Sequence, residues 1–536
     1  MKIFTTKFLF IYLLVSTCVS LSAQTSEFLR AKVLDQQTGE PVLFATVSIK
    51  GKSKGVITNM DGSFRLPINF WKSGISIEIS SMGYEKKEFD LQKFSPNDIN
   101  IVRLVPGVFT LNEAVVIAKG EKRLSARAIV RRAIERIPKN YPLSNFSTKG
   151  YYRDYQLDSL GYLNLNEAIL QVFDNGFDEI DSVSTKTRIY EYKQNTTFRR
   201  DTLADDSYNY KDWKKTIDNA YLESHGGNEF TILRVHDAIR NYKINSFDLI
   251  NSMEDGDILK NHSFKKMEDT YFDGEPLYTI RIKKILPGYE ARGTVYISKN
   301  NYAIHKLQYA VYDDNKRNKN ERLQEIGVKG ELIFEIVSEY NRDSDLKMYL
   351  NYISFHNTFQ LSIRPKFVIE DLLIMAEKRA FLLNFNNQPV IDPIFQSNEW
   401  YDFNYKGKKI EFEKIEVKSN STIVLFPKMS SRDLSNMFGD LETMANKNRD
   451  VSAAMKFKVT GLKDVEGNML NTWTYRNYDQ FREFFTQETF PNLSVGISKD
   501  SLMLKDAPLD GKLQPICLQC KSSSYWMNTP LQNTKQ

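Results

Sequence analysis

The stretch VLDQQTGEPVLFATVSIKGKSKGVITNMDGSFRLP, residues 33–67, alternates short apolar runs with turns that contain glycine. The run ISIEI at residues 75–79 continues this alternation with a strict two-residue period, which is typical of half-buried β-strands. The pair Asp61-Gly62 supplies the positive φ angles that tight hairpins require. Short strands separated by such turns predict a small antiparallel β-sandwich over residues 24–106.

Residues 33–67 and the following ISSMGYEKKEFDL, residues 79–91, resemble the carboxypeptidase-like regulatory domain, which is common at the N-termini of envelope proteins and TonB-dependent receptors of Bacteroidota. The positions that fit the family pattern are Val33, Asp35, Gly39, Glu40, Pro41, Ala45, Val47, Gly51, Gly55, Thr58, Asp61, Gly62, Phe64, Ser81, Gly83 and Tyr84. Ala31 stands where the family usually has glycine. The resemblance implies a binding or folding sandwich without catalytic residues, and it implies no peptidase activity.

Residues 1–23 have the three parts of a secretory signal peptide. A lysine-containing start precedes an apolar run at residues 8–15, and Ala23 is the small residue at the expected cleavage point. The apolar run is shorter than the ~20 residues that span a bilayer. Cys18 leaves lipid attachment open as an alternative. We therefore expect an exported protein in the periplasm or outer membrane of a Gram-negative bacterium, and peripheral association with that membrane is one option.

The remainder of the chain is rich in residues that favour strands. Aromatic residues make up 12% of the 536 residues, and such side chains are enriched in β-sheets. Residues 278–282, 293–298 and 303–309 alternate apolar and polar side chains. This pattern is similar to periplasmic lipoprotein-carrier and lipoprotein-sorting half-barrels, which curl an open sheet around an apolar ligand. We expect a mainly β protein: an antiparallel sandwich followed by a larger β-rich body, with an open half-barrel sheet as one arrangement of that body.

These signals predict how the chain is divided. The expected segments are a signal peptide at 1–23, the sandwich at 24–106, a linker strand at 107–120, the β-rich body at 121–500 and an irregular tail at 501–536. The linker contains LNEAVVI, which is similar to the segment that leads into the plug and barrel of the receptors. The remaining chain is too short for a complete receptor.

A few amphipathic helices are expected in the body, near residues 121–137, 431–446 and 478–488. The first has one apolar stripe and an opposite basic face. The arginines of that face are Arg123, Arg127, Arg131, Arg132 and Arg136. A basic amphipathic helix can lie on an anionic membrane or bind an acidic partner. Because the stripe contains alanines and no tryptophan or phenylalanine, we favour a helix that docks by its stripe and leaves the arginines in water.

The sequence contains no catalytic motif that we can identify. None of His225, His236, His262, His305 and His356 begins an H-E-x-x-H motif, and no nucleophile elbow, P-loop or dinucleotide fingerprint occurs. The run PICLQC contains Cys517 and Cys520 without a second pair or a nearby histidine, so we expect a small disulfide or two unpaired thiols. We predict no catalytic, cofactor-binding or metal site, and no cofactor.

Three functions are compatible with these features. We favour an exported, non-enzymatic envelope protein that binds a protein partner or an apolar ligand. The alternatives are an outer-membrane β-barrel with an N-terminal sandwich and a hydrolase with an unrecognised site. The net charge of only +6 gives no reason to expect nucleic acid as a partner, and the oligomeric state cannot be read from the sequence. An open, apolar-lined sheet within residues 150–360 would support the ligand carrier, whereas a sheet packed on both faces would contradict it.

Overall fold

The computed structural model describes residues 27–532 with internal gaps. The residues left out of the description are 53, 108–123, 159, 206–214, 217–227, 245–246, 250–256, 318–323, 325–327, 392–396, 448, 493–497 and 518–523. The predicted signal peptide and most of the predicted linker strand therefore lie outside the described residues. The chain forms two compact units, one from residues 1–207, 217–359 and 478–536 and the other from residues 208–216 and 360–477.

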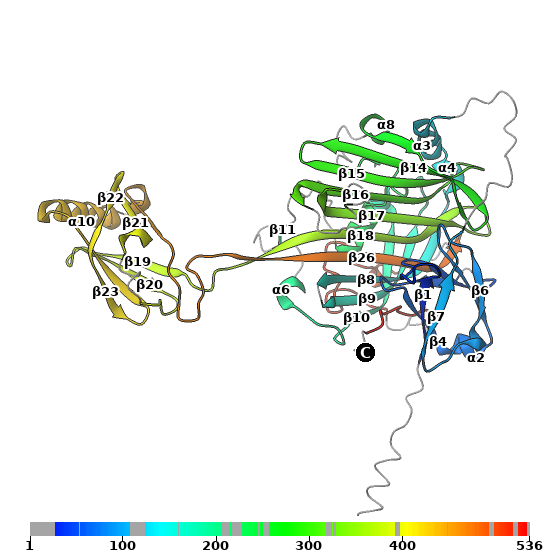
Figure 1. Ribbon diagram of the computed structural model, residues 1–536, viewed down its shortest axis with the longest axis horizontal. Helices are drawn as coiled ribbons and strands as arrows, with labels where there is room; N and C mark the ends of the chain where they lie inside the picture. Colours follow the sequence, from blue (N-terminus) through cyan, green and yellow to red (C-terminus); the bar gives the residue numbers. More distant parts are fainter. Residues whose placement is uncertain are drawn as a thin grey trace, which may run out of the picture. The chain divides into compact units, whose positions relative to one another are not determined.

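The N-terminal residues fold into a β-sandwich of two sheets (Figure 1), with the orders β4-β1-β7 and β3-β2-β5-β6. Its elements are β1 (Phe28–Asp35), β2 (Thr46–Ile49), β3 (Gly55–Ile57), β4 (Ser63–Pro67), α2 (Ile68–Lys72), β5 (Ser76–Ser80), β6 (Lys87–Asp90), η1 (Leu91–Lys93) and β7 (Ile99–Leu104). Val33, Val47 and Ile77 are buried between the sheets. Gly62 turns the predicted hairpin at a φ of 71°, and a Cβ atom there would lie 2.5 Å from the carbonyl oxygen of Val33.

The sandwich differs from the prediction in one strand pair. The pairs of β1 with β4, β2 with β3, β2 with β5, and β5 with β6 are antiparallel, as expected. β7, however, runs parallel to β1. The chain leaves β6 in one sheet, passes through η1 and enters the other sheet, so β7 arrives in the same direction as β1. The local hairpin signals could not reveal this crossover.

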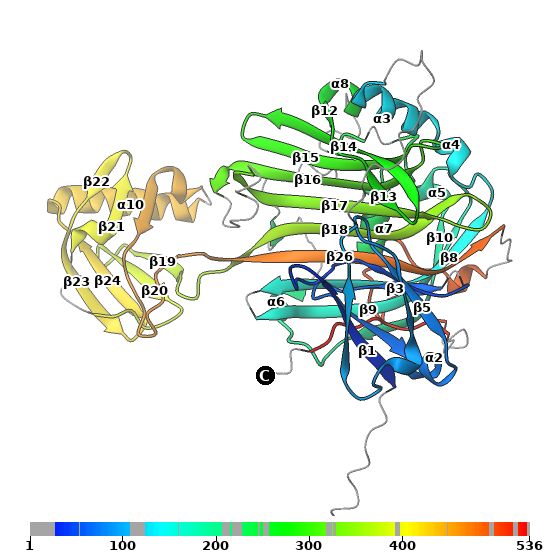
Figure 2. The same cartoon turned by 45° about the vertical axis from the view of Figure 1, so that its right-hand side comes forward.

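The larger part of the same unit is a sheet of 12 strands with the main order β10-β9-β8-β26-β18-β17-β16-β15-β14-β12. Its strands are β8 (Phe146–Asp158), β9 (Gly161–Asp174), β10 (Lys186–Gln194), β11 (Lys215–Thr216), β12 (Ser263–Lys266), β13 (Thr270–Phe272), β14 (Glu275–Leu286), β15 (Tyr289–Ser298), β16 (Ile304–Arg317), β17 (Gly330–Arg342), β18 (Met348–Ile363) and β26 (Thr474–Pro491). Figure 2 shows the long strands lying side by side. Among the described residues β10 and β12 end the order, so the sheet is open, and the prediction of a mainly β protein is confirmed.

One face of this sheet is covered by helices and loops of the chain itself. The helices of the unit are α3 (Ala126–Glu135), α4 (Ile137–Asn140), α5 (Asp181–Ser184), α6 (Thr202–Asp205), α7 (Glu229–Val235), α8 (Ile258–Asn261) and η5 (Lys499–Ser501). Ile129 of α3, Phe230 of α7 and Ile258 of α8 share one buried apolar cluster with the sheet residues Ile280 and Ile297. The apolar face that would hold a ligand in a half-barrel is therefore packed with protein side chains.

The prediction of a helix at residues 478–488 is wrong, because these residues belong to β26, between β8 and β18. Phe484 packs in the cluster below the helices, whereas Phe485 faces the other side, with its ring centroid 5.9 Å from that of Tyr151. Phe481 and Phe485 share a face whether the segment is a helix or a strand, because four residues are about one helical turn and also two strand periods. Hydrogen bonding to β8 and β18 makes the segment a strand and not a helix.

The predicted helix near residues 121–137 begins later than expected. α3 starts at Ala126, and Ser125 caps it by accepting a hydrogen bond from the backbone N–H of Ala128 at 3.2 Å. Its apolar stripe is buried, so the helix docks as we favoured. Pro138 lies in the first turn of α4, where a proline is tolerated. None of the helices in the described part of the chain is long and apolar enough to cross a membrane.

The second unit contains two small sheets, with the orders β19-β20-β24-β23 and β22-β21-β25. Its elements are β19 (Ile369–Met375), β20 (Ala380–Phe385), η3 (Asn398–Trp400), β21 (Tyr401–Tyr405), β22 (Lys408–Ile410), β23 (Phe412–Ser419), β24 (Thr422–Pro427), α10 (Ser431–Asn446), η4 (Val451–Ala453) and β25 (Met455–Val459). α10 covers the range expected from its periodicity. Met437, Phe438 and Leu441 form its buried stripe and pack against both sheets.

Candidate binding cleft

The sandwich packs on the face of the large sheet that the helices leave free. Ile57 of β3 lies in a buried cluster with Tyr151, Tyr352 and Phe485 of the sheet. The ring of Phe44 stacks on Tyr352 with 5.3 Å between the centroids. Successive side chains of a strand point to opposite faces of the sheet. In this sheet one set is buried against the helices and the alternate set against the sandwich.

A buried ion pair lies at this junction. Arg153 of β8 and Glu483 of β26 are both fully buried, and the Arg153 Nε atom donates to the Glu483 carboxylate at 2.5 Å. Arg153 also donates from Nη1 to the side-chain oxygen of Asn59 in the sandwich, and the Tyr155 hydroxyl donates to Glu483 at 3.1 Å. Buried charges must be paired and hydrogen-bonded. This network therefore fixes the position of the sandwich relative to the central strands β8 and β26.

The C-terminal tail reinforces the same junction. It is irregular, as expected, but residues 525–531 are largely buried. Trp526 is 4% exposed within the apolar cluster of the sandwich, and its indole N–H donates to the Arg65 carbonyl at 2.8 Å. Asn528 accepts from the Arg65 backbone N–H at 2.8 Å and donates to the Ile57 carbonyl at 2.7 Å. The tail thus acts as a strap between the sandwich and the sheet.

Asn528→Ala is expected to lower the free energy of unfolding by about 1–3 kcal/mol, because it leaves the half-buried Arg65 N–H and the buried Ile57 carbonyl without their partner. Urea titration followed by tryptophan fluorescence measures the effect. Gln532→Ala is the matched control, since Gln532 makes an exposed hydrogen bond from the same tail. Equal shifts of the unfolding midpoint in both variants would contradict a role of the tail in holding the sandwich against the sheet.

A cleft of about 480 Å³ lies beside the junction, between the polar face of the sandwich and the sheet. The sandwich contributes Thr46, Ser48, Lys52, Lys54, Ser80 and Lys86, and the sheet contributes Phe272, Glu275, His305, Asn341, Arg342, Asn351, Thr486, Gln487 and Thr489, among others. The volume is in the range of ligand-binding pockets. Most of these side chains are polar, so the cleft is suited to a ligand that exchanges hydrogen bonds and charge.

Glu275 organises one part of the cleft wall. Its carboxylate lies 3.2 Å from His305 Nε2 and 3.3 Å from Arg342 Nη2, and it also accepts from the Ser298 hydroxyl. Burial opposes ionisation, but the hydrogen bonds from His305 and Ser298 and the charge of Arg342 together lower the pKa of Glu275 to about 2. Because the Ser298 hydroxyl donates to the carboxylate, it is not poised as a nucleophile for His305 to activate.

The depressed pKa of Glu275 predicts a dependence of stability on acid. Glu275 has a folded pKa of about 2 and a reference value of 4.5, so its ionisation stabilises the fold above about pH 4.5, and this contribution is lost as the pH falls through 2. The difference in urea midpoint between the wild type and Glu275→Gln should therefore shrink from pH 5 to pH 2. Glu442→Gln, at an exposed position of α10, is the control. A difference that stays constant over this range would contradict the assignment.

Besides His305 Nε2, which is ion-paired with Glu275, three almost fully buried polar atoms of the lining residues have no hydrogen-bond partner among the described residues. They are His305 Nδ1, Asn341 Oδ1 and Thr486 Oγ1. The His305 side chain is only 4% exposed. Thr486 is followed by a β-bulge at Gln487, where the pairing of β26 with β8 shifts, and bulges are common next to functional sites. Buried polar groups normally have partners, so the wall of the cleft contains polar atoms whose hydrogen bonds the described residues do not complete.

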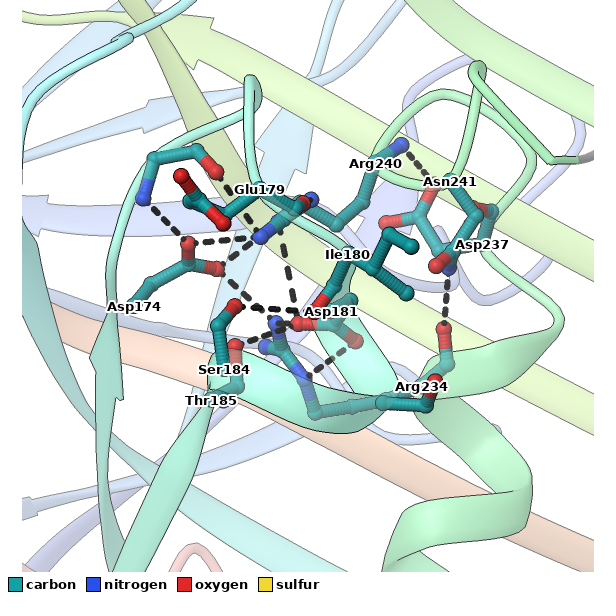
Figure 3. Close-up of polar contacts among 12 residues, drawn as sticks. Asp174, Glu179, Ile180, Asp181, Ser184, Thr185, Arg234, Asp237, Arg240 and Asn241 are labelled. Atoms are coloured by element: carbon teal, nitrogen blue, oxygen red, sulfur yellow. Dashed lines mark hydrogen bonds and ion pairs between the residues drawn. The ribbon is translucent and has the colours of Figure 1, made fainter.

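A second charged cluster lies on the opposite face of the sheet (Figure 3), where the end of β9 meets α5 and α7. Asp174 accepts from Arg240 Nε at 2.9 Å and from Arg234 Nη2 at 3.0 Å, and Asp181 accepts from Arg234 at 2.5 Å. Burial opposes ionisation of Asp181, but Arg234 and Arg240 lower its pKa. The adjacent cavity is only about 30 Å³. Since the charges balance and little space is left, we assign this cluster a structural role.

The structure does not bring the sequence-predicted site residues into the cleft. Arg127 and Arg131 are exposed on α3, and the guanidinium of Arg132 lies 5.1 Å from the ring centroid of Tyr302. Arg136 is half-buried at the end of α3, and Arg123 lies outside the described residues. The arginine face thus remains a prediction as a partner surface.

The predicted cysteine site is described only in part. Cys517 is disulfide-bonded, whereas Cys520 lies outside the described residues, so their pairing remains a prediction. His225 also lies outside them. Over the described ranges no three His, Cys, Asp or Glu side chains form a group that could hold a metal ion.

Sequence reasoning missed the residues that build the junction and the cleft. Of these residues, Arg153 could have been singled out from the sequence, because it is a long basic side chain within the aromatic run Tyr151-Tyr152-Arg153-Asp154-Tyr155. A long cation inside an apolar strand requires a buried partner. That partner, Glu483, lies 330 residues away in the chain, and no local pattern connects the two.

Comparison with known proteins agrees with the fold of the N-terminal module. Residues 29–116 match the CarboxypepD_reg-like domain family. This segment is a CarboxypepD_reg-like domain. In the same region the chain is similar to the TonB-dependent receptor SusC of Bacteroides thetaiotaomicron, with 31% identity over 109 residues. The match covers 20% of this chain and 10% of the receptor, so the chain spans about a tenth of the relative it matches.

Solved structures similar to the chain cover a larger part of it than the CarboxypepD_reg-like domain does. A putative outer membrane lipoprotein-sorting protein domain from Vibrio parahaemolyticus is 12% identical, with a TM-score of 0.22, and the match covers 43% of this chain and 85% of that one. A LolA superfamily protein from Nitrosomonas europaea is 13% identical, with a TM-score of 0.18, and the match covers 44% and 86%. At these low TM-scores the likeness does not extend to the overall fold.

Proposed function

We propose that this protein is an exported, non-enzymatic protein of the Gram-negative cell envelope that binds a segment of a protein partner in the cleft beside its CarboxypepD_reg-like domain. The likeness of that domain to the receptor SusC supports a place in the periplasm or at the outer membrane. Peripheral association with the outer membrane is part of this proposal. The receptor's own activity is not transferred, because the match covers only 10% of it.

The observation that carries the proposal is the polar lining of the cleft. Polar side chains, including those of Ser48, Asn341 and Asn351, line a volume of about 480 Å³. A protein segment offers backbone N–H and carbonyl groups that can satisfy such atoms. An apolar ligand could not do so, and burying these atoms against it would cost free energy.

The apolar-ligand version of the function loses its support from the same structure. The face of the large sheet that would line a lipid-carrier cavity is filled by side chains of α3, α7 and α8, including Ile129, Phe230 and Ile258. The sandwich and the tail cover part of the other face. A sheet packed in this way has its apolar side chains in contact with one another and with the covering elements.

Photocrosslinking in the envelope tests the proposal. A photoreactive amino acid replaces Ser48, which lines the cleft, and in a matched strain it replaces Lys72, which is exposed on α2 outside the cleft. We expect a discrete crosslinked protein in the envelope fraction from position 48 and none from position 72. Loss of this product when Asn351, on the opposite wall of the cleft, is replaced with tryptophan would locate the partner in the cleft. The same product from both positions, or none from position 48, would contradict the proposal.

A further inference from the structure

The cleft has an uncompensated positive charge next to the β26 bulge. Lys54 and Glu488 form a backbone bridge, and Lys149 is the cross-strand neighbour of Glu488. Lys52, two residues before Lys54 in the chain, lines the cleft with it. We call Lys52, Lys54 and Lys149 the lysine cluster. Glu488 is the single carboxylate that pairs with it among the described residues, through a distance of 3.7 Å to Lys54 Nζ.

The surroundings of Lys54 show that the cluster is only partly neutralised. Its side chain is 13% exposed, and the ammonium group lies 4.3 Å from the ring centroid of Tyr525 in the tail. Lys149 approaches the same ring at 4.9 Å. Burial lowers the pKa of Lys54, Glu488 opposes this effect, and the charges of Lys52 and Lys149 add to the lowering. Neither Lys52 nor Lys149 forms an ion pair with any residue that the structure describes.

Two other basic residues of the cleft wall are paired with carboxylates, and Asp343 adds one further acidic side chain to the lining. Lys86 lies 3.2 Å from Asp273, and Arg342 lies 3.3 Å from Glu275. The positive excess of the cleft therefore lies at the lysine cluster, of which Lys52 and Lys54 line the cleft. The half-buried ammonium of Lys54 and the exposed one of Lys52 are suited to an anionic oxygen group, which accepts charge-assisted hydrogen bonds from both.

We infer that the lysine cluster binds a carboxylate, so that the cleft selects an acidic segment of a protein partner. This inference rests on the proposed function and names the chemistry of its ligand. The neutral side chains of Thr46, Asn341 and Asn351 elsewhere in the cleft suit the amides of the same segment. A carboxylate anchored by lysines, with backbone amides held beyond it, uses both kinds of group that the cleft presents.

Fluorescence anisotropy with the chain from residue 24 onward tests the inference. The probes are fluorescently labelled hexaglutamate and hexaglutamine peptides. We expect hexaglutamate to bind about tenfold more tightly than hexaglutamine, and to weaken as salt is added. Lys52→Glu should weaken hexaglutamate binding by about tenfold or more, since it replaces an attractive charge by a repulsive one.

Two matched charge reversals serve as controls. Lys72→Glu changes an exposed lysine of the same domain outside the cleft, and Arg131→Glu changes the basic face of α3. Both should leave hexaglutamate affinity within about twofold, because charges more than a Debye length apart are screened. Equal affinities of wild type and Lys52→Glu, or a loss confined to Arg131→Glu, would overturn the inference. Binding of inorganic phosphate, measured by calorimetry, without any hexaglutamate binding would also overturn it, because the site would then be one for phosphate.

A blocking variant separates this inference from the proposed function. Ser48→Trp places a large side chain in the cleft without changing its charge. If both peptides bind equally and Ser48→Trp abolishes both, the cleft binds protein segments but does not select a carboxylate. If Ser48→Trp leaves hexaglutamate binding unchanged, the cleft is not the site, and the proposed function fails together with the inference.

Discussion

Replacing Arg240 with methionine is expected to lower the free energy of unfolding by about 3–5 kcal/mol, because it leaves a buried carboxylate without its main partner. Arg240 donates to both oxygens of Asp174 at 2.9 Å, and it also donates to the carbonyls of Gly176 and Glu179 at 3.0 Å. Its side chain is 4% exposed and that of Asp174 is 1% exposed. In the variant Arg234 would still pair with Asp174 and Asp181 (Figure 3), but it would have to serve both carboxylates.

Urea titration followed by circular dichroism and tryptophan fluorescence measures this loss. Lys243→Ala is the matched control, because the Lys243–Asp178 pair comes from the same two loops but is exposed to solvent. It should leave the unfolding midpoint unchanged, since exposed ion pairs are screened. A midpoint for Arg240→Met within error of the wild type would show that the cluster does not hold α5 and α7 in place.

Glu483→Gln is the second substitution with a large expected effect, again about 3–5 kcal/mol, because it removes the negative charge that neutralises a fully buried arginine. Arg153 Nε donates to Glu483 at 2.5 Å, and both side chains have 0% exposure. Their pairing raises the pKa of Arg153 although its burial opposes that shift. Asn59 of the sandwich is a neutral partner and cannot replace the lost charge.

A double variant distinguishes a lost pair from a general packing defect. Arg153→Met together with Glu483→Leu removes both charges and fills the space with apolar side chains, which is often neutral relative to a buried pair. We expect this variant to recover most of the stability that Glu483→Gln loses. Trypsin cleavage should be faster in Glu483→Gln than in the double variant, because the less stable variant is open more often. Equal stability of the two variants would contradict the assigned role of the charge.

The local elements were predictable because their signals lie within a few residues of one another. The hairpin at Asp61-Gly62 needs a glycine where φ is positive, and residues 75–79 alternate with the strand period. α10 shows its apolar stripe at helical spacing. The meander of β14, β15 and β16 also follows the chain order. In each case the sequence contains both the element and the turn that joins it to its neighbour.

The errors and omissions share a cause, which is pairing between distant segments. β26 looked like a helix because Phe481 and Phe485 are four residues apart, and only its position between β8 and β18 makes it a central strand. The parallel β7 results from a crossover between sheets. The tail looked unstructured, yet Trp526 is buried in the sandwich about 460 residues earlier in the chain.

The sequence by itself determined the N-terminal CarboxypepD_reg-like domain and the mainly β character of the chain, because turn chemistry and strand periodicity act over neighbouring residues. The tertiary structure alone decided what the protein can bind. It filled the apolar face of the sheet with helices, placed the sandwich on the other face, and formed a polar cleft from segments near residues 50, 300, 340 and 487. The charge and burial of those side chains depend on neighbours hundreds of residues away, so no local pattern contains them.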